Sequence, residues 1–397
     1  MTSPVPHHRH QASLEDVIDL SPQPPLGPSQ RARARRIFYR IAERFEAAEP
    51  PIDPRARPPT YSQPLLVRLT FEYARSEESR DIFLRAFFKA MALDLDAAEG
   101  GDDPDPELDF GELRPLFVGF ADYLMDNFFL PLKASTRRTP QPSPAYHSAV
   151  LRAQGVETPA FVGTPERLSS LRGACLVRDR HRCVISRKFS DREFIARLRQ
   201  YGDDARDDDG ILFSEQDPSL FDGLEVAHIL PHALMKSNTN FELNQSREAA
   251  LAILNMFDSG VAHVINGVDI DRPRNALTLS MRFHQLFGSF DVFFTPVTDT
   301  QHTYRIETFH PVPIALGLPV TRALFITDTR TIDPPSPRLL AVHRAIAHIL
   351  HLSGAGFYID MLLRDMEDNV VRSDGTSALG QMVTLGLGGW LDGAVSS

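Results

Sequence analysis

Hydrophobic residues recur at helical spacing along the first third of the chain. They keep this period over residues 37–45, 65–95 and 113–132, with Pro131 as the expected end of the last segment. Because one face of an α-helix repeats every 3.6 residues, the pattern predicts amphipathic helices that bury one face. We therefore expect a helical domain over residues 30–133. It shows no recognisable chemistry, so it is a candidate for binding a protein partner or for self-association.

The second half of the chain mixes strand-like and helical patterns. Residues 224–230 are an apolar-rich run closed by Pro231, which predicts a buried strand. Residues 290–297 and 303–309 alternate between apolar and polar positions, which predicts a hairpin, and a further strand is expected at residues 322–328. Helical spacing predicts helices at residues 164–179, 248–257, 338–352 and 357–367. The fold class predicted from these elements is α+β.

A further helix is expected directly after Asn275. Leu277, Met281 and Leu286 follow it at helical spacing, and residues 271–275 have the composition of a turn. On this pattern alone, Asn275 is a candidate helix cap.

Composition narrows the class of protein. The chain has 397 residues, 42% of them apolar and 24% charged, as expected for a soluble globular protein of two or three domains. The two cysteines, Cys175 and Cys183, cannot supply a four-cysteine zinc site or a disulfide framework. The sequence shows no signal-peptide pattern and no run of about 18 apolar residues. We expect a soluble intracellular protein without a membrane partner, in either nucleus or cytoplasm.

Charge is distributed unevenly along the chain. The formal net charge is -10, yet residues 164–200 carry ten basic and four acidic residues, a local charge of +6. A local basic face is what nucleic-acid binding requires in an acidic protein. The candidate phosphate contacts are Arg178, Arg180, Arg182, Arg187 and Lys188. The alternative, surface arginines that merely flank a helix, remains open because charge runs alone are weak evidence.

Three residues carry the candidate chemistry. His228 ends the predicted strand, where one ring nitrogen can face a water molecule while the other is held by a neighbour. Asn275 lies nine residues before His284, a step that returns a helical histidine towards the turn. A general base, an amide that orients it and a metal ligand are the parts needed to hydrolyse a phosphodiester.

The pattern Ala227-His228-Ile-Leu-Pro, then Asn275-x-Leu-x-Leu, then His284-x-x-Phe resembles the HNH nucleases, in the group without zinc-knuckle cysteines. The resemblance implies a ββα-metal module and metal-dependent hydrolysis of nucleic acid, with DNA as the expected substrate. It implies that His228 is the general base, that Asn275 braces the hairpin and that His284 binds the metal. The implied cofactor is a divalent ion, Mg²⁺ or Mn²⁺ before Zn²⁺.

Two positions depart from the family pattern. Ala227 stands where many relatives carry a metal ligand before the base, and Gly288 stands where they carry a second helical ligand. Glu225, on the same strand face as Ala227 by the alternation of side chains, and Asp291, beyond the helix, are candidate replacements. His232, in the turn after Pro231, is a further candidate.

These departures leave two alternatives to a nuclease. One is a catalytically degenerate HNH module that binds nucleic acid or a protein partner without cleavage. The other is a protein-interaction role centred on the helical half.

The sequence thus predicts six regions. They are a disordered tail (1–29), a helical domain (30–133), a Pro-rich linker (134–163), an HNH nuclease domain (164–300), a C-terminal β/α region (301–372) and a flexible tail (373–397).

Overall fold

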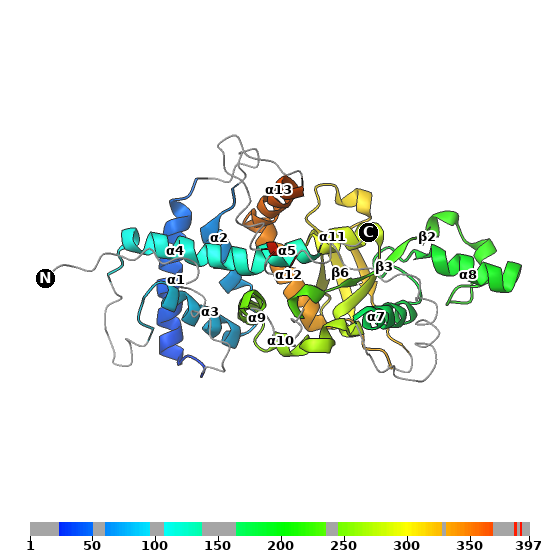
Figure 1. Cartoon of the computed structure of the whole chain (residues 1–397), viewed down its shortest axis with the longest axis horizontal. Coiled ribbons are helices and arrows are strands. Elements are labelled where there is room, and N and C mark those ends of the chain that lie inside the picture. The colour runs from blue at the N-terminus through cyan, green and yellow to red at the C-terminus, as the bar shows by residue number, and fades with distance from the viewer. Residues whose placement is uncertain are drawn as a thin grey trace. The chain divides into compact units, whose positions relative to one another are not determined.

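The computed structural model of the chain (Figure 1) describes residues 24–50, 60–95, 107–136, 164–235, 245–327 and 331–367, together with 385, 386 and 390. Most of the predicted N-terminal tail, linker and C-terminal tail lies outside these residues. The fold is α+β, as predicted. The chain forms two compact units: residues 1–134, 237–263 and 348–392 make unit 1, and residues 135–236, 264–347 and 393–397 make unit 2. The boundaries expected from the sequence remain a prediction.

Unit 1 is helical in its described residues. Its elements are α1 (Pro28–Ala47), α2 (Gln63–Glu72), α3 (Glu77–Ala90), α4 (Phe110–Leu124), a π-helical turn (Met125–Phe129), α5 (Leu130–Thr136, which ends in unit 2), α9 (Gln245–Phe257) and α13 (Ala355–Glu367). Aromatic rings fill the core, with Phe38 4.8 Å from Phe71 and 5.0 Å from Phe87 between ring centroids. α9 packs against α2 and α3 (Figure 1). The hydrophobic residues that recur at helical spacing in this region therefore form the core of unit 1.

Two features of unit 1 differ from the sequence pattern. The helical run over residues 65–95 is broken between α2 and α3, because the Ser76 side chain accepts a hydrogen bond from the Ser79 N–H and starts a new helix. Pro131 does not end the last helix. It is the second residue of α5, directly after the π-helical turn, so its missing N–H lies where the hydrogen-bond register changes.

The centre of unit 2 is an antiparallel hairpin of β3 (Leu224–His228) and β4 (Ala276–Ser280). The register pairs His228 with Ala276 and Glu225 with Leu279. α7 (Thr164–Arg178) and α11 (Met281–Gly288) both pack against the two strands. Leu171 and Cys175 of α7 share a buried cluster with Val226 of β3. β3 carries Glu225 and His228, and α11 carries His284.

The helix expected directly after Asn275 is wrong over its first five residues. Residues 276–280 are strand β4, and the helix begins only at Met281. All five strand residues are buried, and a run buried on both faces shows no alternation that would reveal a strand. Asn275 is consequently a residue of the hairpin and does not cap a helix.

The rest of unit 2 surrounds the hairpin. A second antiparallel sheet contains β5 (Val292–Pro296), β6 (Thr303–Thr308) and β7 (Val320–Ala323), which confirms the predicted hairpin of residues 290–309. Between α7 and β3 lie the short strands β1 (Phe189–Ser190) and β2 (Phe221–Asp222) and helix α8 (Asp191–Tyr201), around a small aromatic core that includes Phe189 and Phe213. α12 (Pro337–Leu352) begins in this unit.

Within the described residues, no single helix has both the length and the apolar character to cross a membrane. Only α12 and α13 taken together, as a bent pair, pass that test, by length and composition alone.

Candidate functional site

Asn275 ties the two ends of the hairpin together. Its side chain is fully buried, and its Oδ1 accepts a hydrogen bond from the Leu230 N–H at 3.0 Å. Its Nδ2 donates to the carbonyl oxygens of Leu230 and Ile270, both at 2.9 Å. The Ile229 N–H donates to the Asn275 carbonyl at 2.8 Å. The segment that follows β3 is thereby held by one amide at the start of β4.

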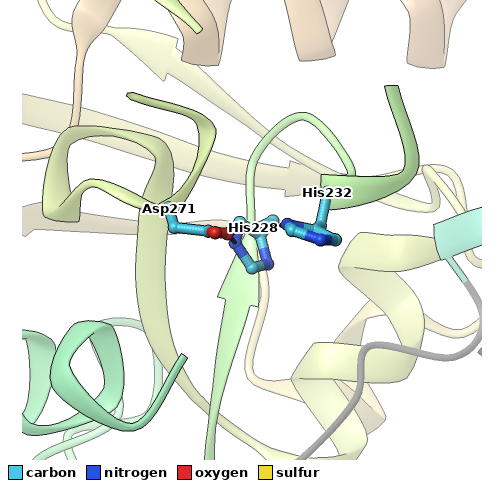
Figure 2. A group of neighbouring side chains, drawn as sticks. All are labelled: His228, His232 and Asp271. Carbon is cyan, nitrogen blue, oxygen red and sulfur yellow. Dashed lines mark hydrogen bonds and ion pairs between the residues drawn. The ribbon is translucent and has the colours of Figure 1, made fainter. Parts of the chain in front are cut away.

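His228, the last residue of β3, is held by a carboxylate. Its Nε2 lies 3.1 Å from Oδ1 of Asp271 (Figure 2), and its side chain is 3% exposed. An ionised carboxylate only accepts hydrogen bonds, so the ring proton belongs on Nε2 and the lone pair on Nδ1. That Nδ1 is buried and has no hydrogen-bond partner among the described residues. It is the atom from which a proton-accepting role could be performed.

Asp271 also holds a second histidine. His232 begins a short 3-10 turn (His232–Met235), and its Nδ1 lies 2.8 Å from the same Oδ1 (Figure 2). The other carboxylate oxygen accepts from Nε of Arg167 at 3.3 Å. Among the described residues, His228, His232 and Asp271 are the one group of three side chains whose potential metal-binding atoms all lie within 4.8 Å of one another.

Sequence reasoning missed Asp271. It lies 43 residues from His228 and looks like an ordinary turn residue, because Pro273 follows closely. The available signal was its place four residues before Asn275, in the segment that closes onto the base-bearing strand.

Burial and charge together set the ionisation of this cluster. Burial lowers the pKa of His228, the hydrogen bond and negative charge of Asp271 oppose that change, and electrostatic interaction with His232 and His284 lowers it further. Burial alone would raise the pKa of the Asp271 carboxyl, but the hydrogen bonds from His228 and His232 outweigh it and bring it well below its usual value. Near neutral pH, His228 is therefore neutral and Asp271 ionised.

His284 pairs with Glu225. The Nδ1 of His284, on α11, lies 2.5 Å from Oε2 of Glu225 on β3. The hydrogen bond from His284 lowers the pKa of the Glu225 carboxyl, although burial opposes the change. His284 also acts electrostatically on His228 and lowers the pKa of that ring, so the pair lies near the candidate base. The structure thus joins two predicted site residues through a contact between strand and helix.

Asp291 is the third candidate ligand of this region. It follows the C-terminal end of the eight-residue helix α11, and its backbone carbonyl accepts from the Phe309 N–H at 2.9 Å and the Thr308 hydroxyl at 2.7 Å. No group of three potential metal ligands in the described part of the chain contains Asp291 with His284 and Glu225. The expectation that Asp291 completes the coordination stays a prediction.

Gly288 has no room for a ligand. A Cβ added there would lie 2.9 Å from the backbone oxygen of Thr136, which is closer than real Cβ atoms approach. The Thr136 hydroxyl also donates to the Gly288 carbonyl at 2.5 Å. The chain segment that enters unit 2 therefore occupies the position where relatives carry a second helical ligand.

Arg178 is a structural residue, so the prediction that it contacts nucleic acid is wrong. Its side chain is fully buried and forms a two-point ion pair with Asp179, with N–O distances of 2.9 and 2.8 Å. The same guanidinium donates to the carbonyl oxygens of Pro273 and Ala276 at 2.7 and 2.9 Å. Arg178 thus fixes the turn that carries Asn275.

The acidic loop at residues 203–210 neutralises much of the basic segment. Arg182 pairs with Asp207 at 2.6 Å and is mostly buried, and Arg180 pairs with Asp209 at 2.8 Å. Asp208 accepts from Arg197 at 2.8 Å. The local charge of +6 covers residues 164–200 only, so it leaves out the carboxylates of residues 207–209 that pair with these arginines in the fold.

Arg187 and Lys188 differ in accessibility. Arg187 donates to the Ala323 carbonyl and lies over the Phe325 ring, 4.2 Å from its centroid, so its guanidinium is used within the fold. Lys188 is 39% exposed and lies 3.7 Å from Asp222. Arg180, at 40% exposure, and Lys188 remain the two accessible candidates for phosphate contact.

Comparison with known proteins gives one result. Residues 183–295 match the sequence profile of a family described as HNH endonuclease, which confirms the predicted resemblance over less than a third of the chain. Neither the curated proteins nor the solved structures contain a match to this chain.

Proposed function

We propose that this protein is a metal-dependent endonuclease that hydrolyses phosphodiester bonds of DNA. The observation that carries the proposal is the buried Nδ1 of His228, held at the end of the hairpin by Asp271 and by the segment that Asn275 braces. A neutral imidazole with a fixed tautomer is what general-base catalysis near neutral pH requires. The family match supports a nucleic-acid substrate.

In this proposal each residue has a separate task. His228 accepts the proton of the attacking water at Nδ1, and Asp271 positions the ring through Nε2. Asn275 holds the backbone beyond His228, so that the base keeps its place when substrate binds. Asp271 acts through His228 and is a positioning residue.

His284 and Glu225 are the residues that fit a divalent ion. Mg²⁺ is usually held by one or two carboxylates, water and substrate phosphate oxygens, so Glu225 would be its main protein ligand and His284 the weaker one. Nδ1 of His284 and Oε2 of Glu225 lie 2.5 Å apart, so these two atoms would turn to one ion once the proton between them leaves. The chemistry that a bound Mg²⁺ or Mn²⁺ supplies there is stabilisation of negative charge at the scissile phosphate.

A second candidate function is supported by the two departures from the family pattern. Ala227 offers no ligand atom, and Thr136 fills the space beside Gly288. A module with so few ligands would bind nucleic acid without cutting it.

Plasmid nicking by purified full-length protein separates these functions. The endonuclease should nick supercoiled DNA with Mg²⁺ or Mn²⁺ and stop with EDTA. His228→Ala should lose about 10²–10⁴-fold in rate while still binding DNA, because only the base is removed. The exposed His263 provides the control, and His263→Ala should cut like the wild type.

DNA binding without cleavage in any metal would establish the degenerate module instead. Cleavage that survives His228→Ala unchanged would remove His228 from the mechanism.

A further inference from the structure

We propose that His228, His232 and Asp271 form a second metal site, selective for Zn²⁺-like ions, and that its occupancy switches off His228 as a base. The switch rests on the proposed function, whereas the metal site does not. The site would take a borderline first-row ion, in contrast to the oxygen-preferring ion assigned to Glu225 and His284.

The spacing of the ligand atoms fits such an ion. Oδ1 of Asp271 lies 3.1 Å from Nε2 of His228 and 2.8 Å from Nδ1 of His232, and all three atoms lie within 4.8 Å of one another. With Zn–N and Zn–O distances of about 2.0–2.2 Å, two ligands of a tetrahedral ion are separated by roughly 3.4 Å. Small side-chain adjustments would therefore bring the three atoms around one ion.

The donor set and its support also fit. Two imidazole nitrogens and one carboxylate oxygen suit Zn²⁺, whereas Mg²⁺ prefers oxygen ligands throughout. Arg167 holds the other oxygen of Asp271 at 3.3 Å, which leaves Oδ1 turned towards the histidines. His228 and Asp271 are almost fully buried, while the His232 side chain is 19% exposed and gives the ion a route from solvent.

The position of the ring proton on His228 explains why metal binding and base catalysis exclude each other. As a base, His228 carries its proton on Nε2, donates it to Asp271 and accepts a second proton at Nδ1. As a neutral metal ligand through Nε2, the ring must carry its one proton on Nδ1. Nδ1 then has no lone pair with which to accept a proton from water. The two ring nitrogens of His228 thus support either role, but not both at once. When the ion binds, Asp271 loses its hydrogen bonds to the two histidines.

Binding can be measured without any activity. Metal-free full-length protein is titrated with Co²⁺, followed by its visible absorption, and with Zn²⁺ against a chelating dye. The wild type should bind one ion that His232→Ala binds at least about tenfold more weakly. His284→Ala and the exposed control His263→Ala should retain it.

The metal affinities of the variants are compared under two conditions. The tail histidines His7, His8 and His10 are common to all variants, so only differences between variants count. His232→Gln, which keeps a polar side chain, repeats the measurement if His232→Ala unfolds at a lower temperature than the wild type.

Inhibition tests the switch. In Mg²⁺, one equivalent of Zn²⁺ should stop nicking by the wild type, whereas the rate of His232→Ala, at whatever level it stands without Zn²⁺, should not change when Zn²⁺ is added. Equal Zn²⁺ affinity in wild type and His232→Ala, or loss of the ion in His284→Ala, would overturn the site. A protein that binds the ion through His232 but never cuts would disprove the proposed function and the switch, while the site itself would stand.

Discussion

At the scale of single residues, Asp271 sets both the tautomer and the charge of the base. It is ionised in a buried position because two histidines donate to one of its oxygens and Arg167 donates to the other. Its negative charge partly offsets the effect of burial on the pKa of His228. Replacing the carboxylate by an amide of the same shape should therefore change the titration of the base with little change in volume.

Asp271→Asn should shift the acid limb of kcat/KM to lower pH. The rate requires neutral His228 and falls as the pH drops through the pKa of that ring. Removal of the negative charge lowers this pKa further, so the limb moves down. The rate on the plateau should fall about 10²-fold or more, because the amide no longer selects one tautomer. pH profiles of nicking in zinc-free Mg²⁺ buffer would measure both effects.

The matched control lies two residues earlier. Asp269 is partly exposed and pairs with Arg272 and Arg274, so Asp269→Asn should leave the profile in place. An acid limb that does not move in Asp271→Asn would show that the carboxylate is structural only.

At the scale of elements, the hairpin of β3 and β4 shows which features of the site could be predicted from the sequence. His228 at a strand end and Asn275 as the brace of the hairpin could be predicted, because the strand pattern and the motif spacing are local. β4 could not be recognised from periodicity, since all five of its residues are buried. The contact of Asp271 with His228 and the obstruction of Gly288 by Thr136 could not be predicted either, because both join segments far apart in the chain.

Asn275→Ala should destabilise the fold more than it alters metal binding. Truncation leaves the Leu230 N–H and the Leu230 and Ile270 carbonyls buried without this partner. Unsatisfied buried groups of this kind cost about 1–3 kcal/mol each, so for three groups the free energy of unfolding should fall by about 3 kcal/mol or more. Denaturant unfolding would measure it. Asn275→Asp keeps the acceptor but loses both donated hydrogen bonds. A decrease of less than about 0.5 kcal/mol in the free energy of unfolding of either variant would refute the bracing role.

At the scale of the whole molecule, charge is balanced locally. The chain carries -10, and the +6 of residues 164–200 is offset where Asp207, Asp208 and Asp209 pair with arginines of that segment. Nucleic-acid affinity should therefore depend on few phosphate contacts and respond weakly to salt. The basic segment was visible in the sequence, but its partners became visible only once the acidic loop had folded back on it.

The double variant Arg180→Gln, Lys188→Gln should weaken DNA binding and flatten its salt dependence. Each phosphate contact contributes about 0.9 to the slope of log K against log salt for duplex DNA, so losing two lowers it by about 1.8. Both side chains are partly exposed, so the fold should tolerate the change. Fluorescence anisotropy with a short duplex at several salt concentrations would give the slope. Arg305→Gln, at an arginine of β6 with 56% exposure, is the control that should leave it unchanged. An equal slope in the double variant and wild type would place the phosphate contacts on other residues.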